Sequence, residues 1–205
     1  REIIERKLKI EWFSFSQVTK VDDELLDLMK KAGCYSIGFG IESVDSDVLK
    51  SIRKPINEEV CEKAISAAKK RGLKVQTFFI FGNKKDTKET IEKTIDFACR
   101  TSPTLAFFNK LVAYPGTEIF EEYFGKDLDD IQWNDFVPMG ANATVANTQL
   151  SKHELERLVY KANLRFYFRP SQLLEILKSI RSLYEFRAYL RSAIGLFLQM
   201  LKWRN

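Results

Sequence analysis

The chain has 205 residues, of which 45% are hydrophobic and 30% charged; this is typical of a soluble globular protein with one core and a helical appendage, and it argues against two full domains. The formal net charge is +5, but residues 151–205 carry eleven Lys and Arg against four acids (+7), which leaves 22 against 24 (−2) in residues 1–150. Because non-specific binding of nucleic acid needs positive charge spread over the folded body, we expect no nucleic-acid partner.

The first half of the chain alternates strand and helix patterns. Strands are predicted at 9–15, 35–41, 74–81 and 105–113, and helices at 22–32, 46–52, 58–71 and from 86 to about 100. This alternation predicts right-handed β-α-β crossovers and therefore a parallel sheet.

Several of these helices carry start and stop signals. Asn57 is the expected N-cap of the helix that follows it, and Gly33 and Gly72 are the expected left-handed stops of two helices. Asp86 and Glu89 have the spacing of a capping box, in which two residues satisfy each other's backbone N–H groups.

The strand at 74–81 is nearly apolar, as expected for a strand covered on both faces. Gln76, Thr77 and Asn109 are polar residues in predicted strands, so they either face a barrel interior or need buried partners. Gly38 and Gly40 within one strand indicate the close approach of a ligand or of another backbone, or they ease a tight contact between strands.

The second half of the chain begins with a weaker pattern between 118 and 146, where we expect a loop-rich connection. Ser151 and Glu154 form a second predicted capping box for a helix that runs to about 169. Pro170 then begins a last helical stretch over about 171–203.

That last stretch has a broad apolar face opposite a basic face, and we expect the apolar face to be buried against something. The apolar residues are Leu173, Leu174, Ile176, Leu177, Ile180, Leu183, Tyr184, Phe186 and Leu190, and the basic residues are Arg181, Arg187 and Arg191.

Three strand ends carry a sharper signal than the order of elements. Residues 32–43 read AGCYSIGFGIES and are followed by a short helix and the basic pair Arg53-Lys54; residues 79–82 read FIFG; residues 114–117 read YPGT. In this order they resemble the fourth, fifth and sixth strand motifs of the radical S-adenosylmethionine superfamily. The resemblance covers about residues 9–120. The segment LRFYFRP at 164–170 and the helices after it are similar to the C-terminal region of the cobalamin-binding members, which include methyltransferases and ring-forming enzymes.

This resemblance implies an α/β fold: a partial parallel (β/α) barrel without its first strands at 1–120, a loop-rich connection at 121–150 and a C-terminal helical extension at 151–205. Two departures stand out. The cluster motif CxxxCxxC of the family is absent, and the turn after the fifth strand, commonly GLPGET in relatives, reads GNKKDT at 82–87 and lacks the proline.

In the whole family, three cysteines hold a [4Fe–4S] cluster that cleaves S-adenosylmethionine to a 5′-deoxyadenosyl radical. The resemblance therefore implies the C-terminal fragment of a radical S-adenosylmethionine enzyme of oxidoreductase or methyltransferase type, inactive alone, whose cluster ligands lie in a missing N-terminal part of the same polypeptide. The substrate would be a small molecule. Cobalamin would belong to the full-length protein if it follows that branch.

Glu42 stands at a predicted strand end, where cofactor contacts gather in parallel barrels. Its carboxylate can accept hydrogen bonds from the ribose hydroxyls or the amino group of the cofactor. Alternatively, Glu42 caps the next helix or pairs with Arg53. Arg53 either binds the methionyl carboxylate through two hydrogen bonds or is a solvated charge at a helix end.

The other residues that the resemblance assigns to the cofactor would flank the adenine or line its site, and plain barrel core is their alternative role. They are Gly40, Ser43, Gln76, Ile80, Phe81, Gly82, Val112, Ala113 and Tyr114. No catalytic residue and no metal ligand is predicted in this chain.

Cys34, Cys61 and Cys99 form no CxxC pair and no disulfide framework, so we expect buried thiols and a cytoplasmic, reducing compartment. His153, the single histidine, is expected to be solvated. Tyr123, Trp133 and Phe136 would line a substrate site or, more simply, pack in the core.

A rival hypothesis assigns residues 171–205 to binding rather than catalysis. A basic, aromatic amphipathic helix of this kind binds an anionic membrane surface or a partner protein. The alternative is that it packs against the barrel or closes the substrate cavity.

Overall fold

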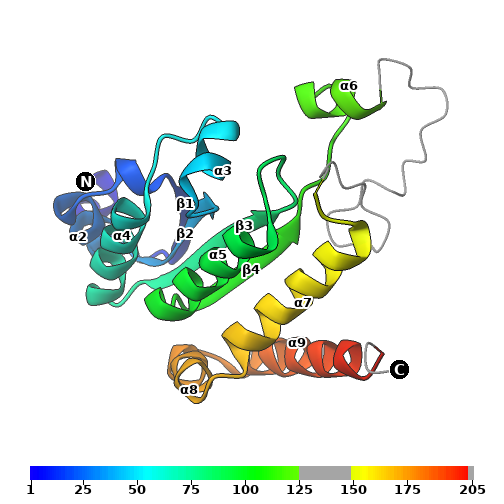
Figure 1. The fold of residues 1–205 in the computed structure, drawn as a ribbon. Coiled ribbons are helices and arrows are strands. Elements are labelled where there is room, and N and C mark those ends of the chain that lie inside the picture. Colours follow the sequence, from blue (N-terminus) through cyan, green and yellow to red (C-terminus); the bar gives the residue numbers. More distant parts are fainter. Residues whose placement is uncertain (125–148, 203–205) are drawn as a thin grey trace.

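The computed structural model describes the backbone of residues 1–124 and 149–202 and contains one four-stranded sheet (Figure 1). The strands are β1 (Trp12–Ser16), β2 (Cys34–Glu42), β3 (Lys74–Phe81) and β4 (Leu105–Lys110). They pair in the order β1-β2-β3-β4, and every pair is parallel. The predicted α/β class with a partial parallel barrel and C-terminal helices is therefore confirmed. β1 starts three residues later and β4 ends three residues earlier than the sequence predicts.

The helices alternate with the strands and then continue to the C-terminus (Figure 1). They are α1 (Glu2–Glu5), a 3₁₀ turn (Val18–Lys20), α2 (Asp23–Lys31), α3 (Ser46–Ser51), α4 (Glu58–Lys70), α5 (Lys88–Thr101), α6 (Glu118–Phe124), α7 (Lys152–Tyr167), α8 (Pro170–Ser179) and α9 (Leu183–Lys202). The predicted loop-rich connection thus begins with the short helix α6, and residues 125–148 lie outside the described part.

Local capping explains most helix ends. The Asn57 side chain accepts a hydrogen bond from the Val60 N–H at the start of α4, as predicted. Ser151 and Glu154 form the predicted capping box of α7. Gly33 has a φ of 91°, a left-handed conformation that glycine adopts without steric cost and that ends α2.

The predicted capping box of Asp86 and Glu89 is wrong. The N-cap of α5 is Thr87, whose hydroxyl accepts from the Thr90 N–H while the Thr90 hydroxyl accepts from the Thr87 N–H. Thr90 thus makes the hydrogen bond to the N-cap N–H that a Glu usually makes. The Asp86 carboxylate instead accepts hydrogen bonds in the turn after β3.

The two faces of the sheet differ in cover. Along β3, buried and partly exposed residues alternate strictly, with Phe79 and Phe81 buried on the helix side and Phe78 half-buried on the other. The expectation that this strand is covered on both faces fails within the described residues. On the open face, the Phe78 ring contacts the rings of Phe15 and Phe107 at centroid distances of 5.6 and 4.8 Å.

The helix-covered face and α7 share one core. Leu155, Ala162 and Phe166 of α7 belong to the same buried cluster as the strands, and the Phe166 ring lies 6.1 Å from that of Phe108 on β4. Ion pairs from Arg165 to Glu92 and Asp96 join α7 to α5 across the surface. α7 therefore packs against the sheet on the same face as the crossover helices.

The last helical stretch is two helices, not one. α8 ends at Ser179, and the ψ of 123° at the following residue, Ile180, breaks the helical path before α9. The prediction that the apolar face of this stretch is buried is also wrong, because most of its large apolar side chains are exposed.

One buried polar side chain ties α8 to the sheet layer. The Gln172 amide donates to the carbonyl oxygens of Pro103 and Thr104, at 3.0 Å each, and accepts from Ser102 and Arg169 at 3.0 and 3.1 Å. Gln172 is fully buried, so its hydrogen bonds have no competition from water.

We expect Gln172→Ala to lower the free energy of unfolding by about 2–3 kcal/mol, because two buried carbonyl groups lose their hydrogen-bond donor and a cavity remains. Urea denaturation measures this loss. Ser171→Ala, at the exposed neighbouring position, is the control and should change stability by less than about 0.5 kcal/mol. Equal stability of the two variants would contradict this role of Gln172.

Candidate functional site

The carboxyl ends of the central strands meet at one rim of the sheet. β2 ends at Glu42 and β3 ends at Phe81, directly before Gly82. The Leu111 N–H donates to the Phe81 carbonyl at 2.8 Å, so the chain leaving β4 stays beside the end of β3. Pro115 follows five residues after the last residue of β4. The predicted common rim of adjacent parallel strands is therefore present.

Glu42 has an unusual backbone at this rim. Its φ is 68°, a left-handed conformation that costs a non-glycine residue about 1–2 kcal/mol. The pairing of β2 with β3 also shifts between Gly40 and Glu42, so that Ile41 has no partner in the register. Such a bulge turns the following side chain out of the regular alternation. Here it directs the Glu42 side chain back along the open face.

The Glu42 carboxylate is only half satisfied. Its Oε1 accepts from the Lys54 ammonium at 3.1 Å, and both side chains are largely covered, with 21% and 25% exposure. Its Oε2 is buried and has no hydrogen-bond partner among the described residues. A buried carboxylate oxygen without a donor is costly, so it marks a place where a donor from outside fits.

The predicted alternative pair of Glu42 with Arg53 is not formed. Arg53 pairs with Glu118 of α6 at 3.2 Å, and these side chains are 81% and 84% exposed. Lys54, the second residue of the basic pair, is the cation beside Glu42. The left-handed φ of 55° at Arg53 turns the chain at the end of α3 and separates these two neighbours.

Gly40 makes room for the carboxylate. A Cβ atom at Gly40 would lie 2.7 Å from Glu42 Oε1 and 3.5 Å from the Lys54 ammonium nitrogen. At Gly38, a Cβ atom would lie 2.6 Å from the Phe15 ring. The first glycine therefore admits the Glu42–Lys54 pair and the second admits an aromatic ring.

Asp86 fixes the turn after β3. Its Oδ2 accepts from the N–H groups of Gly82 and Asn83 at 2.9 and 2.8 Å and from the Asn83 side-chain amide at 3.2 Å. Its Oδ1 accepts from the Thr90 hydroxyl at 3.2 Å. Burial raises the pKa of the Asp86 carboxyl above its usual range, against the lowering effect of these hydrogen bonds. Asp86 thus holds the turn that lacks the usual proline.

The other predicted cofactor residues divide between the two faces of the sheet. On the open face, Gln76 donates to the Ser36 hydroxyl at 3.0 Å and Ile80 is half-buried. On the helix side, Phe81 is buried and the Ser43 hydroxyl lies 3.4 Å from that of Thr94. The polar Thr77 also points to the helix side, where it donates to a β4 carbonyl.

The predicted cofactor residues in the segment after β4 differ in burial. Val112 and Ala113 are buried, whereas Tyr114 is 42% exposed. Residues such as Val112 and Ala113 can therefore offer backbone groups to a ligand more readily than side chains.

The cysteines do not form a metal site. Cys34 and Cys61 are buried, Cys99 is half-buried, and burial raises the pKa of the Cys61 thiol to about 12. Within residues 1–122 and 149–195, no three His, Cys, Asp or Glu side chains are grouped to hold a metal ion. Trp133, Phe136 and the side chain of Tyr123, the residues predicted to line a substrate site or pack in the core, lie outside the described residues.

Comparison with known proteins agrees with the fold. Residues 1–98 match the sequence profile of the Radical SAM superfamily. An uncharacterized methyltransferase of Pyrococcus horikoshii is 30% identical over 82% of this chain and 36% of its own length. An anaerobic magnesium-protoporphyrin IX monomethyl ester cyclase of Rubrivivax gelatinosus is 30% identical over 66% of this chain and 25% of its own length. The chain thus spans about a quarter to a third of these relatives.

A solved structure supports the fold alone. The radical S-adenosylmethionine methyltransferase TsrM of Kitasatospora setae, determined with cobalamin and a [4Fe–4S] cluster bound, superposes with a TM-score of 0.56. The sequence identity is 23%, over 60% of this chain and 25% of that protein.

We expect Asp86→Ala to lower the free energy of unfolding by about 2–3 kcal/mol, since two buried backbone N–H groups lose their acceptor. Hydrogen exchange at Gly82 and Asn83 should accelerate along with this loss. Asp22→Ala, which removes an exposed N-cap carboxylate, is the control and should cost about 1 kcal/mol without changing exchange at the rim. Unchanged exchange at Gly82 in Asp86→Ala would show that Asp86 does not hold the turn.

Proposed function

We propose that the chain, whose residues 1–98 match the Radical SAM superfamily, is the C-terminal part of a radical S-adenosylmethionine enzyme of methyltransferase or oxidoreductase type. The observation that carries the proposal is the half-satisfied Glu42 carboxylate at the shared strand rim. The relatives include methyltransferases and a cyclase, which supports both reaction types. The fragment alone would be inactive.

The residues at the rim fit S-adenosylmethionine. Its amino group and ribose hydroxyls are donors, which the unpartnered Oε2 of Glu42 lacks. Its methionyl carboxylate is an anion, and the ammonium of Lys54 or the guanidinium of Arg53 would bind it. Lys54 is the better placed of the two for a ligand of Glu42, because it already contacts that carboxylate.

The remaining rim residues would shape the site around the nucleoside. Gln76 and Ile80 face the open side, and Tyr114 is exposed beside the rim. The backbone groups of 81–82 and 112–113 would flank the adenine, with the turn held by Asp86. Ser43 would act indirectly, since its hydroxyl accepts from the Asp45 N–H in the turn after β2.

Gly40 would have a permissive role in this site. Without a Cβ atom it leaves the Glu42–Lys54 pair lying flat against the strand, so a ligand can approach from the open face.

A [4Fe–4S] cluster does not fit the described residues, because their three cysteines are dispersed and not grouped to hold a metal. We propose that its ligands lie in an upstream part of the same polypeptide. Such a cluster, once reduced, would supply one-electron chemistry on S-adenosylmethionine, and Glu42 and Lys54 of this chain would hold and orient that cofactor. Cobalamin would be a second cofactor of the full-length protein.

The open face of the sheet supports such an upstream partner. Phe13 and Phe15 of the edge strand β1 are 56% and 64% exposed, beside the half-buried Phe78 and Phe107. Parallel sheets are normally covered on both faces. Earlier strands that continue the barrel from the β1 edge would cover these rings and enclose a small-molecule substrate. We propose a cytoplasmic location for the whole protein, in line with its free cysteines.

Glu42→Gln should weaken binding of S-adenosylmethionine by about 10- to 100-fold in the cluster-containing polypeptide, because charge-assisted hydrogen bonds contribute about 1.5–3 kcal/mol. Equilibrium dialysis under anaerobic conditions measures the affinity. Glu59→Gln is the control, since Glu59 is an exposed carboxylate paired with Lys63, neither of which is assigned to the cofactor, and it should change affinity less than about twofold. Lys54→Gln should weaken binding more than Arg53→Gln. Equal affinities of the Glu42→Gln and Glu59→Gln proteins would refute the assignment of Glu42.

Iron–sulfur reconstitution tests the division of the site between two parts of one polypeptide. Incubation of this chain with iron, sulfide and a reductant should leave no visible absorption band of a [4Fe–4S] cluster after desalting. The polypeptide extended upstream to include its CxxxCxxC segment should give that band. A stoichiometric cluster on the present chain that is lost in Cys99→Ser would overturn the proposal.

A further inference from the structure

Two C-terminal helices expose an apolar surface that the enzyme proposal does not use. We call it the C-terminal apolar face. Its members are Leu173, Leu174 and Leu177 of α8 and Leu183, Tyr184, Phe186, Leu190 and Ile194 of α9, with exposures between 44% and 83%. Single exposed apolar residues are ordinary, but eight large exposed apolar side chains on two consecutive helices mark a surface for interaction.

Polar contacts on the other side of both helices fix the direction of this face. Gln172 anchors α8 to the residues after α5. On α9, Glu185 pairs with Lys74 at 2.9 Å. Between α8 and α9, Arg181 pairs with Glu11 and lies over the Tyr35 ring. These groups occupy the inner side of each helix, so the leucines cannot turn inward without breaking them.

The outward side also carries uncompensated positive charge. Lys178, Arg187 and Arg191 are exposed and form no ion pair with any described residue. Glu175 is the one acid of residues 170–195 that is not paired with the barrel. Three cations against one acid, beside a row of leucines, is the charge and polarity pattern of a helix that lies in a membrane interface.

We propose that the C-terminal apolar face docks on an anionic lipid surface. The leucine, tyrosine and phenylalanine side chains would enter the boundary between headgroups and acyl chains, while Arg187 and Arg191 would contact the phosphates. In the described residues no helix combines the length and hydropathy needed to cross a membrane, so the helices lie on the surface. A second copy fits this face less well, since two-fold pairing would bring the cations of both copies together.

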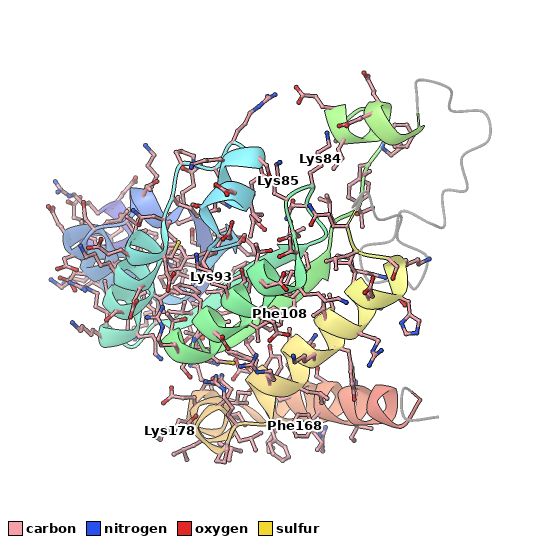
Figure 2. All side chains as sticks on the ribbon, viewed as in Figure 1. Lys84, Lys85, Lys93, Phe108, Phe168 and Lys178 are labelled. Carbon is pink, nitrogen blue, oxygen red and sulfur yellow. The ribbon has the colours of Figure 1, made fainter. Side chains whose placement is uncertain are left out.

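The position of the face is compatible with the enzyme proposal but does not depend on it. α9 contacts Lys74 at the start of β3, so it lies at the amino ends of the strands, opposite the rim. Figure 2 shows Phe168 and Lys178 at the α8–α9 side of the molecule and Lys84 and Lys85 at the other end. A docked protein would therefore keep its rim open to the aqueous phase.

Co-sedimentation of this chain with vesicles tests the proposal. Binding is expected to vesicles of phosphatidylcholine with phosphatidylserine, to fall steeply with added salt and to be weak on phosphatidylcholine alone. Arg187→Gln with Arg191→Gln should weaken binding on the order of 25-fold, since each basic residue near such a surface contributes about fivefold. Leu177→Asp with Leu190→Asp should weaken it at least about tenfold.

Matched controls test whether lost binding comes from this face or from any loss of positive charge or apolar surface. Lys63→Gln and Leu25→Asp change an exposed lysine and an exposed leucine on the barrel and should leave vesicle binding unchanged. Circular dichroism identifies any variant that has lost its fold, and the two arginine substitutions break no ion pair among the described residues.

Three outcomes would overturn the proposal. The first is equal binding to neutral and anionic vesicles, or no binding. The second is a concentration-dependent dimer, abolished by Leu190→Asp, which would assign the face to a second copy. The third is vesicle binding by this chain that disappears in the longer polypeptide, which would assign the face to another part of the same protein. Survival or loss of S-adenosylmethionine binding is measured separately, so failure here leaves the enzyme proposal intact.

Discussion

Parallel pairing of the four strands is the constraint on which the rest of the structure depends. It places every carboxyl end at one edge of the sheet and every amino end at the other, and it requires a crossover helix between successive strands. Those helices cover one face only (Figure 1). The rim with Glu42 and the contact of Lys74 with α9 consequently lie at opposite ends of the sheet.

At the rim, backbone strain and an unsatisfied polar atom coincide in one residue. Glu42 combines a left-handed φ, a register shift and a buried carboxylate oxygen without a donor. Each feature alone lowers stability, and none is needed to end a strand. The burial of β2 and β3 on their helix side overdetermines the backbone there, which allows the strain to persist. Such a concentration of local cost is expected where a side chain is held ready for a ligand.

Much of the fold could be predicted because its signals are local. Period and capping gave the helix that begins after Asn57, and the motif order gave the parallel rim with Glu42 on it. Contacts between distant residues could not be predicted. Thr90 rather than Glu89 completes the cap of α5, because a buried Asp86 competes for the same turn. Lys54 rather than Arg53 pairs with Glu42, because the left-handed backbone of Arg53 points the two neighbouring side chains in different directions.

The break between α8 and α9 also depends on contacts between distant residues that the sequence pattern does not predict. An unbroken amphipathic pattern over 171–203 predicts one helix with a buried stripe. The chain instead turns at Ile180. A single straight helix starting from the Gln172 anchor would carry Glu185 away from Lys74, and the turn permits both contacts. Two polar anchors thus outweigh the propensity for one helix, and the leucines that periodicity assigned to the core remain at the surface.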